Sequence, residues 1–202
     1  MPVAAPSLIF VVPGPIDTRT GGYEYDRRII DGLRRAGWEV SLHQLADSFP
    51  FPSPGDRDEA ERLFAKLPDQ AMVLVDGLAF GVLADEAERH ASRLRFVALV
   101  HHPLAEETGL DAVDAAALAA SERRALAAAR LAIVTSGATA EGLSRYGVSP
   151  GHVVVVGPGT DRGAAAAGSG SPALHLLCVA TLTTRKGHEL LLRALAGLRD
   201  RK

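Results

Sequence analysis

The chain has 202 residues, enough for one domain with a well-buried core but too few for two domains of ordinary size. Hydrophobic residues make up 47% of it and charged residues 23%, which excludes a chain that is disordered throughout. The net charge of -2 excludes the basic surface by which nucleic-acid-binding proteins attract phosphates, so we expect no nucleic-acid partner.

Short apolar runs alternate along the chain with longer segments of helical periodicity. Strands are expected at residues 8–12, 39–43, 72–75, 96–100, 132–135, 153–156 and 176–179. Helices are expected between them at residues 23–36, 57–66, 80–90, 112–129, 138–146 and 187–198. Strands that are apolar throughout are typical of sheets buried on both faces. Right-handed crossovers between them predict an α/β fold with a doubly wound, mainly parallel Rossmann-like sheet.

Two local signals mark helix ends, and one marks a domain boundary. Asp56 is expected to cap the helix that follows the proline-rich loop at residues 49–55, and Gly37 to end the first helix. The segment 163–172 is rich in Gly, Ala and Ser and predicts a flexible linker. A strand and a helix cannot enclose a core of their own. We therefore expect a Rossmann-like domain at 1–162 and the first β-α unit of an incomplete second domain at 173–202.

The single cysteine and the lack of targeting segments suggest a cytoplasmic protein. Cys178 lies in the apolar run 176–180, where a small buried side chain is a simpler interpretation than a nucleophile. The amino terminus lacks the basic segment of a signal peptide, and the apolar run 8–12 is too short for its core. No apolar stretch approaches the length of a membrane span.

The first candidate site is the loop that ends in Gly21 and Gly22, after the first expected strand. Adjacent glycines let a backbone approach a ligand closely, and the first turn of the next helix favours an anion such as a diphosphate. A tight turn into a helix explains the same residues. Both interpretations stay open, because neither dinucleotide nor P-loop glycine motifs occur here.

The second candidate site follows the strand that ends at Val100. It contains His101, His102, Glu106 and Glu107, which could recognise sugar hydroxyls, transfer protons or bind a metal. A metal is the least favoured of these, because adjacent histidines in an extended segment point in opposite directions. A polar loop without a function is the alternative interpretation.

The third candidate site opens the last expected helix. Arg185 and Lys186 follow Thr183 and Thr184, and positive charge in a first helical turn opposes the helix dipole. An anion bound there would explain these charges. An ordinary solvated helix start, capped by one of the threonines, is the alternative.

Two further patterns have simpler explanations. Asp56 and Asp58 form a D-x-D pattern of the kind that holds a metal and a nucleotide in one class of glycosyltransferase, but capping explains it better at a helix start. Four arginines of the first helix could contact an acidic membrane surface peripherally, although a solvated face is the default. They are Arg27, Arg28, Arg34 and Arg35.

From about residue 8 to 198, the chain resembles the amino-terminal half of retaining GT-B glycosyltransferases of family 4. The ordered set of motifs carries the resemblance. These motifs are Gly21-Gly22, His101 after the fourth strand, Glu122-Arg-Arg, and the segments 132–136, 146–148, 153–161 and 185–188.

The resemblance implies two Rossmann-like domains across a cleft, the first mainly contacting the acceptor and the second the nucleotide sugar. It implies that Gly21 and Gly22 approach the donor diphosphate or sugar, and that His101 is the catalytic residue beside the reacting carbon. Arg185 and Lys186 would neutralise the diphosphate leaving group. Neither a metal nor a cofactor is expected. Further acceptor or sugar contacts are expected at His102, Glu106, Glu107 and Ser136.

The chain departs from the family pattern in two places. Where many relatives carry Gly-Arg after the first strand of the second domain, it has Ala180-Thr181. The paired glutamates that hold the donor in the family fall outside the 202 residues. This chain alone is therefore not expected to transfer sugar efficiently.

The leading hypothesis is a metal-independent retaining glycosyltransferase that moves a sugar from a nucleotide donor to a carbohydrate or lipid-linked acceptor. A non-catalytic domain that binds a glycan or a partner chain is the alternative, since the charged residues 199–202 would suit a solvated terminus. A nucleotide-binding oxidoreductase ranks last, because the glycine fingerprint is lacking.

Overall fold

The computed structural model describes residues 5–172 and 174–198. The chain divides into two compact units. The first comprises the residues up to Glu106 together with Leu110–Pro158, and the second comprises Glu107–Gly109 and the residues from Gly159 on. Residues 1–4, 173 and 199–202 lie outside the described residues. They include the charged run 199–202 and the outer ends of both predicted domains.

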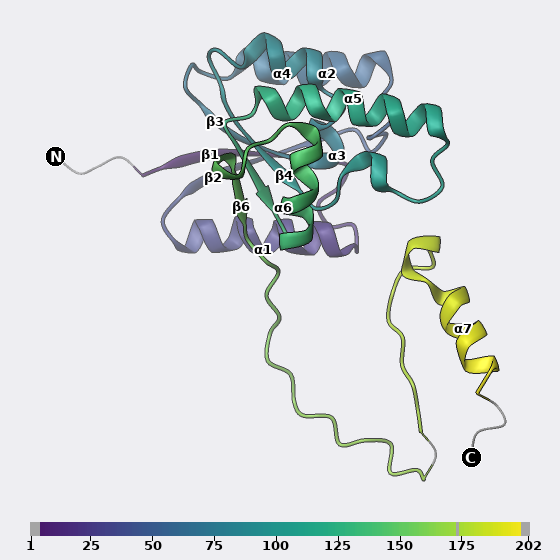
Figure 1. Cartoon of the computed structure of the whole chain (residues 1–202). Helices are drawn as coiled ribbons and strands as arrows, with labels where there is room; N and C mark the ends of the chain where they lie inside the picture. The colour runs from purple at the N-terminus through teal and green to yellow at the C-terminus, as the bar shows by residue number, and fades with distance from the viewer. Residues whose placement is uncertain (1–4, 173, 199–202) are drawn as a thin grey trace. The chain divides into compact units, whose positions relative to one another are not determined.

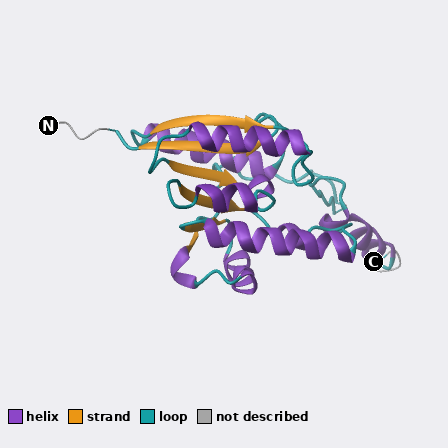
Figure 2. Ribbon diagram, turned by 90° about the horizontal axis from the view of Figure 1, so that it is seen from above, coloured by secondary structure: helices purple, strands orange, loops and turns teal. Residues whose placement is uncertain are grey.

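A six-stranded parallel sheet forms the centre of the first unit (Figures 1 and 2). Its strand order is β2-β1-β3-β4-β5-β6, which requires a crossover from β2 past β1 to β3. This confirms the predicted α/β fold with a doubly wound, Rossmann-like sheet. The strands are β1 (Ser7–Pro13), β2 (Glu39–Leu45), β3 (Met72–Asp76), β4 (Arg95–Val100), β5 (Leu131–Val134) and β6 (Val153–Val155).

Helices follow the strands in the expected alternation, and short 3-10 turns η1 to η4 lie in the loops. The helices are α1 (Gly21–Arg35), α2 (Pro54–Lys66), α3 (Gly77–Phe80), α4 (Ala84–His90), α5 (Ala112–Ala128), α6 (Gly137–Leu143) and α7 (His188–Ala196). The 3-10 turns are η1 (Leu104–Glu106), η2 (Ser144–Tyr146), η3 (Pro150–His152) and η4 (Thr184–Lys186). Figure 1 shows α1 on one face of the sheet and α2, α4 and α5 on the other.

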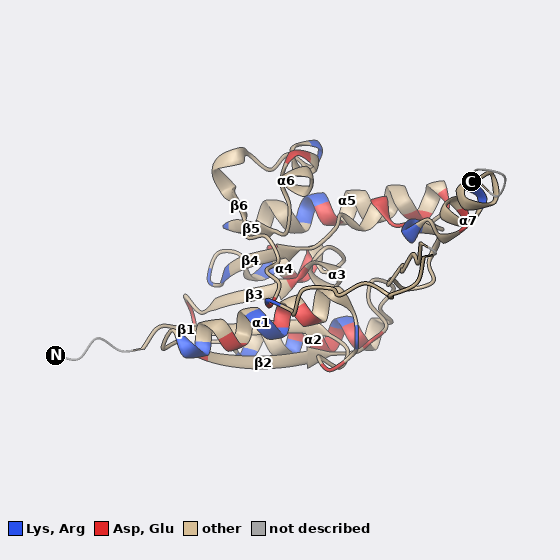
Figure 3. Ribbon diagram, turned by 90° about the horizontal axis from the view of Figure 1, so that it is seen from below, with Lys and Arg blue, Asp and Glu red and all other residues tan. Residues whose placement is uncertain are grey.

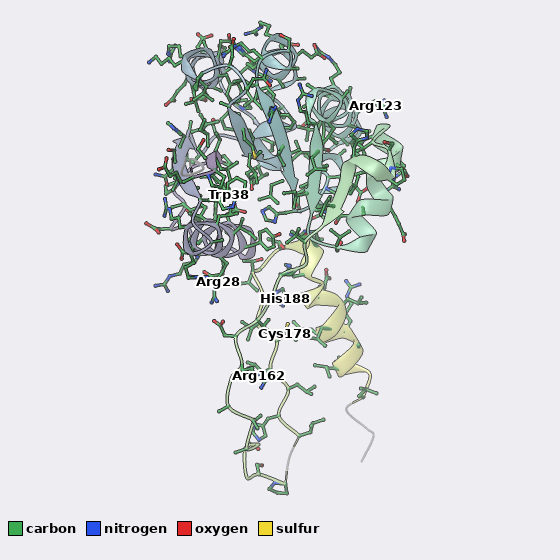
Figure 4. The ribbon with its side chains drawn as sticks, turned by 90° about the vertical axis from the view of Figure 1, so that its left-hand side faces the viewer. Arg28, Trp38, Arg123, Arg162, Cys178 and His188 are labelled. Carbon is green, nitrogen blue, oxygen red and sulfur yellow. The ribbon has the colours of Figure 1, made fainter. Side chains whose placement is uncertain are left out.

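Two hydrophobic clusters fill the space between the sheet and its helices. Strand β1 contributes Phe10 to the cluster on the α1 face and Val11 to the cluster on the opposite face. Trp38, labelled in Figure 4, packs against the α1-face cluster. Because consecutive residues of a strand point to opposite faces, burial of both faces explains the continuous apolar runs in the sequence.

Helix α2 begins inside the proline-rich loop, earlier than predicted. The N-cap residue is Ser53, whose hydroxyl accepts a hydrogen bond from the Asp56 N–H at 3.3 Å. The Asp56 carboxylate in turn accepts from the Ser53 N–H at 2.8 Å. The prediction that Asp56 is the N-cap residue was therefore wrong. Pro54 suits the first turn of the helix, and Asp56, three residues after Ser53, completes a capping box.

We expect Ser53→Ala to lower the free energy of unfolding by about 1 kcal/mol, because the Asp56 N–H then loses its acceptor. Urea unfolding of the first unit measures the change. The exposed Ser92→Ala is the control and should change stability by less than about 0.5 kcal/mol. Equal stabilities of the two variants would contradict this role of Ser53.

The helix predicted at 80–90 is interrupted. Helix α3 ends at Phe80, and α4 begins at Ala84. A Cβ atom on Gly81 would lie 2.6 Å from Cδ1 of Leu104 and 3.3 Å from Cγ of Glu122. The turn between the helices thus brings the Gly81 backbone against the loop after β4, a close approach that helical periodicity does not reveal.

The second unit differs from the prediction. Residues 174–182 form no strand, so the strand predicted at 176–179 was wrong. A lone segment has no neighbouring strand to hydrogen-bond, and its side chains stay exposed. Cys178 is exposed rather than buried, with its Sγ atom 3.8 Å from Nδ1 of His188 (Figure 4). The segment 159–172, which includes the predicted linker, has no helix or strand.

Charged residues of both signs lie along the first helix (Figure 3). Arg27 and Arg28 both pair with Glu24, at 2.6 and 2.9 Å. No helix in the described ranges is both long and apolar enough to span a bilayer. Contact of the α1 arginines with a membrane surface stays a prediction.

Candidate functional site

The candidate site lies at the carboxyl edge of the sheet, where the loops after β1, β3 and β4 meet. Asp76 is the last residue of β3, and His101 directly follows β4. Asp26 comes from the second turn of α1. Three elements that are distant in sequence thus supply one cluster, at the edge where parallel α/β sheets bind ligands. We call these three residues the His101 cluster.

One ring nitrogen of His101 serves both carboxylates. Its Nε2 atom lies 3.0 Å from Oδ1 of Asp26 and 3.4 Å from Oδ2 of Asp76. The Asp26 side chain is fully buried and that of Asp76 nearly so, whereas the His101 side chain is 24% exposed. Asp76 is held in place as the N-cap of α3, where Oδ1 accepts from the Leu78 N–H at 2.7 Å. The cluster therefore consists of two buried carboxylates and a partly exposed imidazole.

The two carboxylates keep His101 charged. Burial alone lowers the pKa of His101, but hydrogen bonds to Asp26 and Asp76 and their negative charges outweigh it and raise the pKa to about 9. Burial also raises the pKa of Asp26; His101 opposes this rise and Asp76 adds to it. His101 is therefore an imidazolium at neutral pH, and the cluster of two carboxylates and one imidazolium has a net negative charge.

Two residues of α1 fix the His101 ring. The Tyr25 ring meets it edge-on, with ring centroids 5.3 Å apart and planes at 90°. On Gly22, a Cβ atom would lie 3.6 Å from Cδ2 of the imidazole, so the backbone of this first turn runs close beside the ring. The hydroxyl of Tyr23 donates to the Pro13 carbonyl, and burial together with the nearby carboxylates raises the pKa of Tyr23 to about 12.

A buried glutamate ties the loop after His101 to helix α5. Oε2 of Glu122 accepts a hydrogen bond from the Leu104 N–H at 3.0 Å, and the residue is only 1% exposed. Burial raises the pKa of Glu122 to about 7; the Leu104 hydrogen bond opposes the rise and the Glu106 carboxylate adds to it. Glu122 thus helps to position the segment that carries His101.

The structure brings some predicted site residues together. Gly21 and Gly22 were expected in the loop before the first helix, but they form its first two positions. The helix starts earlier than predicted because Thr20 caps it, accepting from the Tyr23 N–H at 3.2 Å. Gly22 lies beside His101, whereas a Cβ on Gly21 would meet nothing within 4 Å.

Other predicted residues have structural partners of their own. Ser136 caps α6 by accepting from the Thr139 N–H at 3.1 Å. Glu106 pairs with Arg145 at 2.5 Å, and the Glu107 carboxylate accepts from the Thr108 N–H at 3.1 Å. The Nε2 atom of His102 is buried, with no hydrogen-bond partner among the described residues.

Arg185 and Lys186 lie in the second unit, within the exposed turn η4. They are not among the residues of the His101 cluster. Helix α7 begins at His188, and its N-cap residue is Gly187 in a left-handed conformation with φ 67°. The alternative interpretation, in which Thr183 or Thr184 caps this helix, was therefore wrong. The proposed diphosphate contacts of Arg185 and Lys186 stay predictions.

The His101 cluster contains side chains of the kinds that also hold metal ions. Ligand atoms of Asp26, Asp76 and His101 lie within 4.8 Å of one another. Nε2 of His101 already lies within hydrogen-bond reach of both carboxylates, so one ring proton satisfies this geometry. The arrangement therefore fits a charged hydrogen-bond donor, and the absence of a metal stays a prediction.

Comparison with known proteins identifies no family. No family model matches the chain, and no curated protein sequence matches it.

Sequence reasoning missed the two carboxylates of the cluster. Asp76 directly follows an apolar strand, which is the signal that drew attention to His101. Asp26 stands four residues after Gly22, and this spacing places both on one face of a helix. Both signals were therefore present in the sequence, but only the fold shows that they converge on one imidazole.

Proposed function

We propose that the protein is a retaining glycosyltransferase that moves a sugar from a nucleotide donor to a carbohydrate or lipid-linked acceptor, without a metal and in the cytoplasm. The supporting observation is the charged His101 at the carboxyl end of β4, beside Gly22 in the first turn of α1. The sequence resemblance expects a histidine at this position to contact the transferred sugar. The parallel sheet with its ligand-binding edge is compatible with that role.

The chemistry of the cluster suits glycosyl transfer. As the nucleoside diphosphate leaves, the transferred sugar develops oxocarbenium-like positive charge. His101 would donate a hydrogen bond to the sugar, while the net negative charge of the cluster would favour the developing positive charge. The N–H groups of Gly21 and Gly22 open α1 and would face the donor, as the resemblance implies.

The experiment that tests this proposal uses the native product, isolated from its source cells at the length that the cells make. It is incubated with a panel of nucleotide sugars and acceptors, and release of nucleoside diphosphate and the anomeric configuration of the product are measured. We expect transfer with retention. His101→Asn should lower the rate by about tenfold or more, because a charged hydrogen bond is lost.

The control is His43→Asn, which replaces a half-buried histidine of the edge strand β2. It should leave the transfer rate unchanged. Absence of turnover with every donor, or equal rates for His101→Asn and the unmodified protein, would contradict the proposal. Binding of a glycan without turnover would instead favour the non-catalytic alternative.

A further inference from the structure

The Nε2 atom of His101 points to two buried carboxylates. It faces Oδ1 of Asp26 at 3.0 Å and Oδ2 of Asp76 at 3.4 Å. Oδ2 of Asp26 is buried and has no hydrogen-bond partner in the described part of the chain. A buried carboxylate that is poorly satisfied requires its one cationic partner, so Asp26 and His101 hold each other strongly.

The Nδ1 edge of the same ring is available to a ligand. Within the described ranges, Nδ1 of His101 makes no hydrogen bond. This nitrogen is also not among the buried unpartnered polar atoms, although the residue is part-buried. In the imidazolium both ring nitrogens carry protons, so Nδ1–H is a free donor at the ligand-binding edge.

The ring cannot readily turn to exchange these two edges. Tyr25 meets it at 90°, and the Gly22 backbone runs close alongside. Rotation would also remove the proton that Asp26 and Asp76 share. The direction in which Nδ1–H donates is therefore set by Asp26 of α1 and Asp76 of β3, which contact the opposite nitrogen of the ring.

The charge of the surroundings selects the acceptor. Asp26 and Asp76 form ion pairs with His101 and, among the described residues, with no lysine or arginine. Tyr23 and Tyr25, which lie near these carboxylates, are neutral, and burial together with the carboxylates raises their pKa values. An anionic oxygen at Nδ1 would meet this excess negative charge, whereas a neutral hydroxyl oxygen would not.

We infer that Asp26 and Asp76 are positioning residues that hold the Nε2 side of the His101 ring, so that Nδ1–H is the donor to a ligand and binds a neutral oxygen such as a sugar hydroxyl and not a phosphate. This inference rests on the proposed function for its substrate class. With protons on both nitrogens, His101 donates hydrogen bonds and does not act as a general base.

Ring-nitrogen NMR of the 202-residue chain tests the inference without any turnover. The chain carries ¹⁵N-labelled histidine, and the His101 signals are assigned as those missing in His101→Gln. We expect Asp26→Asn and Asp76→Asn each to lower the pH midpoint of His101 by about one pH unit or more, because one partner charge is lost. Asparagine retains an oxygen that can cap α3 at position 76.

The matched control is Asp31→Asn, an exposed residue of the same helix α1, which should leave the midpoint unchanged. The amide spectrum of each variant establishes that it is folded. An unchanged His101 midpoint in folded Asp26→Asn and Asp76→Asn would overturn the inference. So would a metal ion on Nε2 in the purified protein, detected by mass spectrometry and loss of the ring-proton coupling.

Two further measurements test the class of ligand that His101 binds and the positioning role of Asp26. Pyrophosphate added to the labelled chain should leave the His101 signals in place, and a saturable shift of these signals would refute a neutral acceptor. In the native product, Asp26→Asn should lower kcat for sugar transfer more than it raises KM. Because the NMR result needs no turnover, failure of the proposed transfer activity and failure of this inference are distinguishable.

Discussion

Replacing Phe96 by alanine is expected to lower the free energy of unfolding by about 3–5 kcal/mol. Phe96 is fully buried on the central strand β4 and packs between two other rings. Its centroid lies 5.1 Å from that of Phe64 on α2 and 5.6 Å from that of Phe80 on α3. The truncation therefore leaves a cavity and removes two aromatic contacts, in a core where little can move to fill the space.

The comparison for this prediction is Phe51→Ala. Phe51 is 59% exposed in the proline-rich loop, so its loss should change stability by about 0.5 kcal/mol or less. Urea unfolding monitored by circular dichroism gives both values. A loss below about 1 kcal/mol in Phe96→Ala would show that the aromatic cluster does not hold α2 and α3 on the sheet.

Glu122→Gln is expected to stabilise the protein at pH 8, by up to about 3 kcal/mol. The carboxyl of Glu122 has an ordinary pKa of 4.5, which burial raises to about 7 in the folded chain. Each pH unit between these values corresponds to about 1.4 kcal/mol. Glutamine keeps an oxygen that can accept the Leu104 hydrogen bond but carries no charge to bury.

The pH dependence has a definite sign. Below pH 4.5 the carboxyl is protonated in both the folded and unfolded chains, so it adds no pH dependence. Between 4.5 and about 7 only the folded chain retains the proton, and its stability falls as the pH rises. Above pH 7 the loss is complete.

Urea unfolding of the wild type and Glu122→Gln from pH 4 to pH 8 measures this difference. The stability gap between the two should open between pH 4.5 and 7 and then stay constant. The exposed Glu59→Gln is the control, with a change of about 0.5 kcal/mol or less at every pH. Equal stabilities of wild type and Glu122→Gln at pH 8 would contradict the account.

The sheet could be predicted because its strands are buried on both faces. The runs 8–12 and 96–100 are apolar throughout, and each became a parallel strand extended by one or two residues. A continuous apolar run reflects burial of both strand faces, and it can be identified from the local sequence. Helix beginnings were harder, because Thr20 and Ser53 start α1 and α2 before the apolar periodicity sets in.

The segment 174–182 shows the limit of this reasoning. Its composition is that of a buried strand, but a strand needs a neighbour for its hydrogen bonds. The described second unit supplies none, so Leu177 and Cys178 are exposed. Apolar runs predict where burial would be favourable and do not establish that a partner surface is present.

The position of His101 in the candidate site could be predicted from the sequence, but its charge could not. His101 could be identified because it directly follows a buried strand at the ligand-binding edge. That Asp26 and Asp76 both lie within 3.4 Å of its Nε2 atom depends on how the fold brings α1 and the ends of β3 and β4 together. The charge of a histidine is decided by such neighbours, and residue type alone does not give it.

Titration of His101 in the unmodified chain, followed by ¹⁵N NMR of its ring, tests most directly whether Asp26 and Asp76 hold this side chain as a charged donor. The signals are separated from those of the other six of the seven histidines by their loss in His101→Gln. We expect a midpoint near pH 9 and protons on both ring nitrogens at pH 7. A midpoint at the ordinary value of 6.5 would contradict this expectation, because Asp26 and Asp76 would then not hold His101 as a charged donor at the carboxyl edge of the sheet.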